Sequence, residues 1–284
     1  MESLQQTHSI SQRRACECLG VSRSTVRYSS VKPDLDASVI EHLAGLRARH
    51  RDWGYRKLTR LLQNEGFGVN HKRIYRICKE QGWLCEPPQA RSNKARGDSQ
   101  NACHIRQATC ANQVWAIDFV KDRTMHGKPL KVFTIVDEYS RECLAIEVRH
   151  TMNQREVADV LLELFKSRGV PEWIRSDNGG EFSGKWIGQV LEMCGSEAAL
   201  IAPGSPWQNG KNERFNGILS QEVLSKEVWG NALEAQVCCN QWKEIYNQVR
   251  PHGSLGLMTP EEYATQARLQ GKWHHQPLVI VPSL

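Results

Sequence analysis

Three acidic residues occupy positions where a negative charge calls for an explanation. Asp118 lies inside the apolar run VWAIDFV, where an uncompensated carboxylate costs several kcal/mol. Asp177 ends the stretch EWIRSD just before two glycines, and Glu213 follows the turn-like sequence GSPWQNG. Taken singly, each has an ordinary structural explanation, as a paired strand residue, a turn former or a charge at a helix N-terminus.

Taken together, the three carboxylates indicate metal-dependent phosphoryl transfer. Carboxylate oxygens are the hard ligands that Mg²⁺ prefers. Two divalent ions carry four positive charges, which three carboxylates and one phosphodiester neutralise. Such a pair activates the attacking oxygen and stabilises the leaving oxygen of an in-line displacement. This chemistry requires Asp118, Asp177 and Glu213 to meet in the folded chain.

The elements expected around these acids form an α/β layer. Apolar runs at 114–122, 131–140 and 141–150 with short connections predict an antiparallel meander. The pattern then alternates between helices and strands, at 155–169, 172–177, 185–195, 197–203 and 212–224. We predict a mixed five-stranded sheet with flanking helices that resembles ribonuclease H. This arrangement brings the middle of the first strand, the end of the fourth strand and the start of the last helix together.

The front of the chain is basic and helical. Residues 1–108 hold 19 Lys and Arg against 10 Asp and Glu, whereas the remainder holds 18 against 21. We predict a helix-turn-helix around Gly20 and a second all-α unit, whose exposed cations bind DNA phosphates. A helical bundle with a basic outer face explains each helix equally well. The predicted DNA-binding residues of this region are Arg23, Arg27, Arg56, Lys57, Lys72, Arg73 and Arg76.

The predicted domain organisation has five parts. They are a helix-turn-helix (1–32), a second helical unit (33–85), a basic linker (86–108), the catalytic core (109–230) and a C-terminal helix and tail (231–284). No apolar run approaches the roughly 20 residues of a membrane helix. The ten cysteines are scattered and form no CxxC pair, so we expect reduced thiols in a cytoplasmic, nucleoid-associated protein.

Several sequence blocks resemble one family closely. They are WAIDFV, VDEYSRECLAIEV, SDNGGEF, GSPWQNGKNERFNG and YNQVRPHGSLGLMTPEEYA, together with the 35 residues that separate Asp177 from Glu213. These blocks resemble the OrfB transposases of bacterial insertion sequences of the IS-three type, within the DDE integrase superfamily. The stretch from Trp53 to Trp83 is similar to the helical domain that precedes the core of that family.

The resemblance implies a site and a reaction. Asp118, Asp177 and Glu213 fall on the three acidic positions of the family, which implies that they are catalytic and bind two Mg²⁺ or Mn²⁺ ions. A metal-activated water then frees a 3′ hydroxyl at the end of the element, and this hydroxyl attacks another phosphodiester. Residues expected to contact DNA around the site are Asn178, Gln208, Asn209, Lys211 and Arg214. Expected partners are element ends, target DNA, further copies of the chain, and an upstream-frame OrfA protein or fusion.

One position departs from the family pattern. Members usually carry Lys or Arg seven residues after the glutamate, where this chain has Ser220. Lys211 and Arg214 are expected to compensate in part. Two alternatives stay open: a DNA-binding descendant that has lost catalysis, and a nuclease acting on RNA/DNA hybrids. We further expect Asp137 to be a turn residue and His252 to be a surface loop imidazole.

Overall fold

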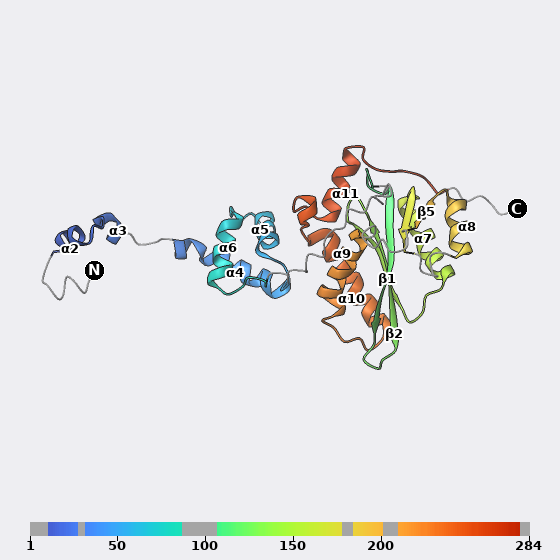
Figure 1. Cartoon of the computed structure of the whole chain (residues 1–284), viewed down its shortest axis with the longest axis horizontal. Coiled ribbons are helices and arrows are strands. Elements are labelled where there is room, and N and C mark those ends of the chain that lie inside the picture. Colours follow the sequence, from blue (N-terminus) through green and yellow to red (C-terminus); the bar gives the residue numbers. More distant parts are fainter. Residues whose placement is uncertain (1–10, 28–31, 87–106, 178–183, 201–209, 279–284) are drawn as a thin grey trace, which may run out of the picture. The chain divides into compact units, whose positions relative to one another are not determined.

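The computed structural model describes residues 11–27, 32–86, 107–177, 184–200 and 210–278. The chain divides into two compact units, Met1–Cys85 and Glu86–Leu284, and each is described by itself (Figure 1). Most of the expected linker 86–108 lies outside the described residues. Among the described helices, none combines the length and the apolar character needed to cross a bilayer.

The first unit begins with the expected pair of short helices. Helix α2 (Gln12–Leu19) starts at Ser11, whose side chain accepts a hydrogen bond from the Arg14 backbone N–H, and it ends at Gly20. The positive φ of Gly20, 63°, is a conformation that glycine adopts without steric cost, so this residue stops the helix. Helix α3 (Arg23–Arg27) follows at once.

Three further helices form a small core of their own in the first unit. They are α4 (Lys32–Arg49), α5 (Tyr55–Asn64) and α6 (His71–Glu80). Leucines and isoleucines spaced three and four residues apart lie on one face of each helix, which buries them together. The members of this core that are fully buried are Leu43, Leu58, Leu62, Ile74 and Ile77.

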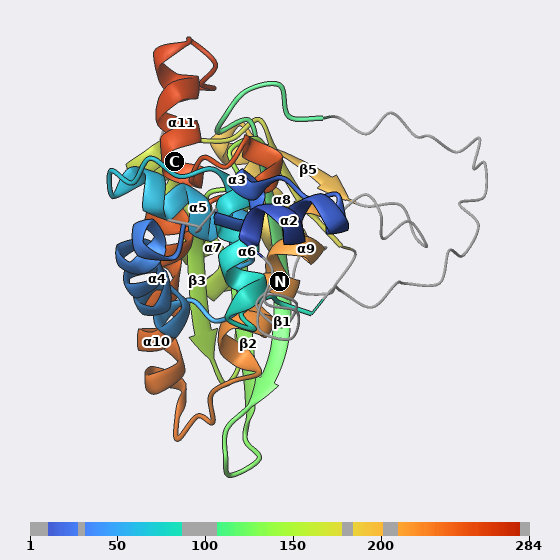
Figure 2. The same ribbon diagram turned by 90° about the vertical axis from the view of Figure 1, so that its left-hand side faces the viewer.

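The second unit is built on one five-stranded sheet with the order β3-β2-β1-β4-β5. Its strands are β1 (Val114–Arg123), β2 (Pro129–Asp137), β3 (Cys143–Arg149), β4 (Trp173–Ser176) and β5 (Glu197–Leu200). The first three pair antiparallel, and β4 and β5 run parallel to β1. The long β1–β2 hairpin extends at one end of the sheet (Figure 2). The mixed five-stranded sheet predicted from the sequence is thus confirmed.

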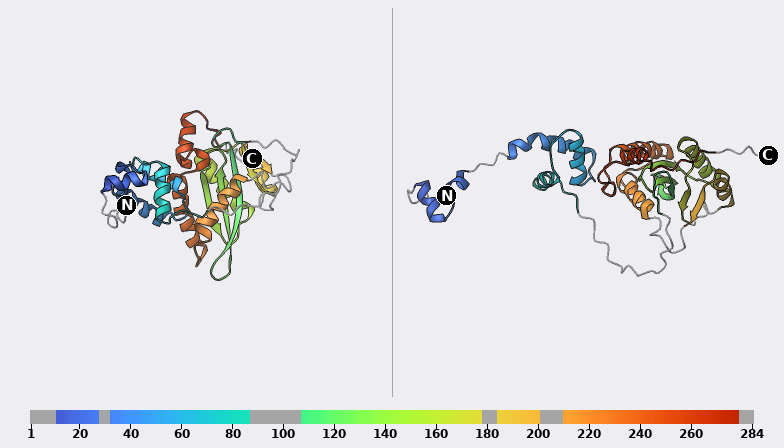
Figure 3. Two further views of the ribbon diagram at one scale, coloured as in Figure 1. Left: turned by 60° about the vertical axis from the view of Figure 1, so that its left-hand side comes forward. Right: turned by 90° about the horizontal axis from the view of Figure 1, so that it is seen from above.

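Helices cover both faces of this sheet (Figures 1 and 3). One face packs against α7 (Gln154–Arg168) and α8 (Lys185–Cys194), and the other against α9 (Gly210–Leu219) and α10 (Ala232–Glu244). Successive strand residues point to opposite faces. On β2, Val132 and Val136 therefore face α9 and α10, while Phe133 and Ile135 face α7 and α8.

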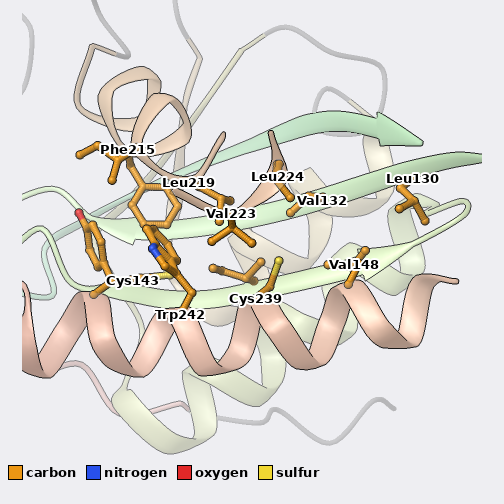
Figure 4. Packing of buried hydrophobic residues seen from close by; sticks show 14 of the residues in the cluster. Leu130, Val132, Cys143, Val148, Phe215, Leu219, Val223, Leu224, Cys239 and Trp242 are labelled. Atoms are coloured by element: carbon orange, nitrogen blue, oxygen red, sulfur yellow. The ribbon is translucent and has the colours of Figure 1, made fainter. Parts of the chain in front are cut away.

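The segment 231–284 is set apart in the sequence as a C-terminal helix and tail, but the part of it that forms α10 packs into the same core. Cys239 and Trp242 of α10 contact Phe215 and Leu219 of α9 over the sheet (Figure 4). Helix α10 continues as a π-helical turn, η3 (Ile245–Val249), and α11 (Pro260–Leu269) follows a short 3₁₀ turn, η4 (Gly253–Leu255). These contacts make α10 part of the core that carries the acidic residues.

The structure corrects one expectation and confirms two others. His252 was expected on the surface and is only 7% exposed, because its ring packs edge-on against Tyr246 at a centroid distance of 4.7 Å. Asp137 is the turn residue that was predicted, since its buried carboxylate accepts hydrogen bonds from the Tyr139 and Ser140 backbone N–H groups. All cysteines of the described ranges are free thiols, as expected.

Candidate active site

Asp118 lies on the face of the sheet that α9 covers. It pairs across the strands with Thr134 of β2, whose neighbours on the same face are Val132 and Val136. The alternation of β1 turns Ile117 toward the opposite, fully apolar side. Asp118 is therefore half-buried between the sheet and α9.

Asp177 lies beside Asp118 because of the parallel register between β1 and β4. Ala116 pairs with Arg175 in this register. Two residues further along each strand are Asp118 and Asp177, and a step of two residues returns to the same face of the sheet. Asp177 directly follows the last residue of β4 and is exposed.

Glu213 lies in the first turn of α9 and is exposed. One turn later, Asn216 Nδ2 donates a 2.9 Å hydrogen bond to Asp118 Oδ2. Thr134 Oγ1 in turn donates to Asn216 Oδ1 at 3.0 Å, which fixes the orientation of the amide. Asn216 is not among the residues predicted from the sequence, although its spacing of three residues from Glu213 places both on one side of a helix.

The three acids share one electrostatic environment. The pKa of Asp118 is raised to about 6, chiefly by burial and in addition by the negative charges of Asp177 and Glu213, while hydrogen bonds from the Phe119 backbone N–H and from Asn216 oppose the rise. Charges act on one another in this way only over short distances or through a poorly polarisable medium. Asp118 therefore experiences the negative charges of both other acids that the sequence singled out.

The chemistry of this donor set suits a divalent cation. Repulsion among the carboxylates disfavours the ionised form of Asp118, and a bound cation would relieve that repulsion. In the described part of the chain, however, no three His, Cys, Asp or Glu side chains are grouped closely enough to form a metal site.

Comparisons with known proteins decide the family. Two models described as "Integrase core domain" match residues 108–206 and 194–260, and one described as "HTH-like domain" matches residues 34–91. The "Insertion element IS407 uncharacterized 31.7 kDa protein" of Burkholderia multivorans is 34% identical over 94% of this chain and 95% of its own length. The chain belongs to the IS-three type family of insertion-sequence transposases.

Two further comparisons agree with this assignment. The transposase is 33% identical to the "Insertion element IS476 uncharacterized 39.2 kDa protein" of Xanthomonas euvesicatoria, over 92% of this chain and 74% of the relative. It is also similar to a chain of the simian T-cell lymphotropic virus intasome in complex with PP2A regulatory subunit B56 gamma. That chain has a TM-score of 0.50 and 17% identity, and the match covers 84% of the transposase and 80% of the viral chain. This likeness supports the fold alone.

The cations expected beside the acids of the transposase differ in their availability. Lys211 Nζ lies 3.1 Å from Glu138 Oε2, so its ammonium is engaged within the protein. Arg214 is exposed in the first turn of α9. Ser220 is half-buried at the start of a π-helical turn, η2 (Ser220–Leu224), that continues α9. The other predicted contacts around the site, Asn178, Gln208 and Asn209, lie outside the described residues.

The basic residues of the helical unit also differ in how far they are exposed and in their partners. Arg23, Arg27, Arg56 and Lys72 are exposed, whereas Lys57 is half-buried with its ammonium 5.7 Å from the centre of the Trp53 ring. Arg73 and Arg76 both form ion pairs with the buried Asp36. These two arginines therefore tie α6 to α4, and their contact with DNA stays a prediction.

Replacing Asp36 by Asn is expected to destabilise the α4–α6 unit by about 1–3 kcal/mol, the usual range for hydrogen bonds to charged groups. Burial acts to raise the pKa of Asp36, but the hydrogen bonds from Arg76 and Arg73 outweigh burial and leave the pKa lowered. The folded carboxylate thus stabilises the unit above the unfolded pKa of about 3.9, and the stabilisation is lost as the pH falls through the lower folded value.

Amide hydrogen exchange of residues 36–80 in the full chain measures this effect. Faster exchange in Asp36→Asn at pH 7, and a smaller difference from wild type under acid conditions, are expected. Glu41→Gln serves as a control because Glu41 is an exposed acid on the same helix, α4. Equal exchange in the Asp36 variant and wild type at pH 7 would show that the ion pairs contribute nothing.

Proposed function

We propose that this transposase cleaves and joins DNA strands at the ends of its element by metal-dependent phosphoryl transfer at Asp118, Asp177 and Glu213. The observation that carries the proposal is geometric: the register of β1 and β4 puts Asp118 and Asp177 on one face of the sheet, and α9, the helix that carries Glu213, is hydrogen-bonded to Asp118 through Asn216. The raised pKa of Asp118 agrees with this arrangement. A carboxylate with a raised pKa beside further acids, in a chain with an integrase core, is typical of a functional site.

In this proposal the three carboxylates would hold Mg²⁺ or Mn²⁺, with two ions at the site. When bound, the ions activate the attacking oxygen and stabilise the leaving oxygen. Asn216 keeps the carboxylate of Asp118 in one orientation through the hydrogen bond to Oδ2. The exposed guanidinium of Arg214, next to Glu213, is the cation that we propose contacts a DNA phosphate beside the site.

The substrates proposed are the element ends and a target duplex. The unit that carries the HTH-like domain supplies exposed cations for phosphate contacts, Arg56 and Lys72 among them. Joining two ends in one reaction requires two active sites, so we propose that several copies of the chain assemble on DNA. An upstream-frame OrfA protein or fusion is proposed as a further partner.

A second candidate is a DNA-binding protein without catalytic activity. Two observations favour it: Ser220 stands where relatives of this type carry a cation, and Lys211 is paired with Glu138. Both reduce the positive charge available to DNA next to the acids. The position of Asp118 and Asp177 on one face of the sheet, with Glu213 on the helix that covers it, supports the enzyme more strongly, because a protein that only binds DNA gains nothing from several negative charges on one face.

A strand-transfer assay with duplexes that carry the element's own ends, in Mg²⁺ or Mn²⁺, tests the proposal. Asp177→Asn is expected to lower the rate of joining by at least about 10³-fold, as for essential catalytic groups in other enzymes. The matched control is Asp159→Asn, the same change at an exposed acid on α7, on the opposite face of the sheet.

The outcomes separate the three candidates. If wild type and Asp177→Asn join DNA ends at the same rate, the enzymatic proposal is wrong. If neither joins ends and both bind them, the protein that binds DNA without catalysis is the correct reading. Cleavage of the RNA strand in an RNA/DNA hybrid, without any joining of DNA, identifies a nuclease of the ribonuclease H type.

A further inference from the structure

We infer that Glu138 is a positioning residue that holds the segments carrying Asp177 and Glu213 at a fixed separation. The inference rests on the proposed function, since it concerns the acids assigned there. Glu138 belongs to none of the sequence motifs that indicate metal binding or DNA contact. The structure nevertheless gives it contacts to both segments.

The position of Glu138 is fixed by the turn after β2. The carboxylate of Asp137 accepts hydrogen bonds from three backbone N–H groups, those of Asn112, Tyr139 and Ser140. The backbone N–H of Glu138 itself donates to the Val114 carbonyl oxygen at 3.0 Å. These hydrogen bonds restrain the backbone of the turn, so the Cα of Glu138 has a well-defined position.

Each carboxylate oxygen of Glu138 meets a different cation. Oε1 lies 2.8 Å from Arg175 Nη1, and Oε2 lies 3.1 Å from Lys211 Nζ. The Glu138 side chain is 1% exposed and that of Arg175 is 7% exposed, while Lys211 is one-third exposed. A carboxylate this deeply buried depends on both cations, because water is not available to replace them.

Both cations stand two residues before an acid of the site. Arg175 precedes Asp177 at the end of β4, and two residues apart on a strand point to the same face. Lys211 precedes Glu213 in the first turn of α9. Glu138 therefore connects the end of a strand to the beginning of a helix through Arg175 and Lys211, which are 36 positions apart in the chain.

This connection has a consequence for catalysis. Two of the three acids lie at the ends of their elements, where backbone hydrogen bonds are fewest and fraying is greatest. A common anion that pairs with both ends restrains them to one relative position. An error of about 1 Å in the position of catalytic groups is enough to slow a reaction by about 10²-fold.

The alternative is that the ion pairs of Glu138 with Arg175 and Lys211 stabilise the fold and do not affect the positions of Asp177 and Glu213. A matched pair in the same unit allows the distinction. Glu142 accepts hydrogen bonds from Arg168 and is similarly withdrawn from water, with a side chain 15% exposed, yet it contacts neither β4 nor α9. Glu142→Gln thus makes the same chemical change away from the acids.

The experiment compares Glu138→Gln with Glu142→Gln in the full chain. Glu138→Gln is expected to lower kcat for strand transfer by about 10- to 100-fold, the effect typical of residues that orient catalytic ligands. The Kd for DNA carrying the element ends is expected to stay within about twofold of wild type, since the side chain of Glu138 is only 1% exposed. Amide exchange is expected to increase in residues 172–177 and 210–216 only.

A second variant keeps the inference testable if Glu138→Gln does not fold. Lys211→Met removes the ion pair between Glu138 and Lys211, at a partly exposed position, and leaves the ion pair between Glu138 and Arg175. Faster amide hydrogen exchange is then expected in residues 210–216 and not in residues 172–177. If Lys211 serves mainly as a DNA contact, this variant instead weakens DNA binding, reduces its salt dependence and leaves exchange unchanged, which overturns the inference.

Failure of the inference differs from failure of the proposed function. If Asp177→Asn abolishes strand transfer and Glu138→Gln behaves like Glu142→Gln in kcat and in exchange, Glu138 positions nothing. If Asp177→Asn retains the wild-type rate, the proposed function itself fails. Exchange measured without substrate then still reports whether Glu138 restrains the two segments.

Discussion

Asp118→Asn is expected to abolish strand transfer and, at the same time, to make the folded protein more stable at neutral pH. The folded pKa of Asp118 is about 6, against about 3.9 for an unfolded aspartate. The ionised form is therefore penalised in the folded state at pH 7 by at most about 3 kcal/mol. The neutral amide avoids this penalty, although it weakens the hydrogen bonds from Phe119 and Asn216. We expect a net stabilisation of about 1–2 kcal/mol.

The pH dependence of this gain follows from the direction of the shift. Because the folded pKa is the higher one, folded Asp118 binds its proton more tightly than unfolded Asp118 does. Its contribution to stability is fully present below about pH 4 and is lost as the pH rises to about 6. The asparagine variant loses nothing over this range. The difference in unfolding free energy between the asparagine variant and wild type is therefore expected to grow from about pH 4 to about pH 6 and to level off above about pH 6.

Urea unfolding at several pH values, with a chelator present, measures the difference. Asp159→Asn, which replaces an exposed acid on α7, is the control and is expected to follow wild type. A variant that is less stable than wild type at pH 7 would show that the carboxylate of Asp118 is well accommodated. Sensitivity of the activity to this substitution, combined with a gain in stability, is typical of functional sites.

Arg250→Met is expected to lower the free energy of unfolding of the core by about 3–5 kcal/mol, the cost of removing one partner of a buried ion pair. Arg250 Nη2 donates to Glu222 Oε1 at 2.8 Å, and both side chains are less than a tenth exposed. Trp242 Nε1 donates to the other oxygen, Oε2, at 3.1 Å. Methionine fills a similar volume, so the loss is mainly that of the charge facing Glu222.

A double variant distinguishes the ion pair from simple packing. Glu222→Gln combined with Arg250→Met is expected to be more stable than Arg250→Met alone, because it leaves no buried charge without a partner. Arg149→Met, at an ion pair with Glu156 in which both groups are considerably exposed, is expected to cost about 0–1 kcal/mol. Equal losses in the Arg149 and Arg250 variants, measured by urea unfolding, would contradict the argument.

Local patterns in the sequence were enough to predict most of the fold and the position of each acid on its element. Apolar runs of strand length with short polar connections mark β1 and β2, and spacings of three and four mark α5 and α6. The same patterns place Asp118 within a strand, Asp177 at a strand end and Glu213 in the first turn of a helix. These features depend on neighbours a few residues away, so they are readable from the chain alone.

What the sequence determined by itself is the type of each element, the sheet that these elements form, and the three acidic positions. Only the tertiary structure decided which side chains pair. Asn216 reaches Asp118 from 98 residues away, and Lys211 pairs with Glu138 across 73 residues. It also decided that Arg73 and Arg76 face Asp36 and that His252 is buried. The physical reason is that pairing and burial depend on distances through space, which no local spacing of residues encodes.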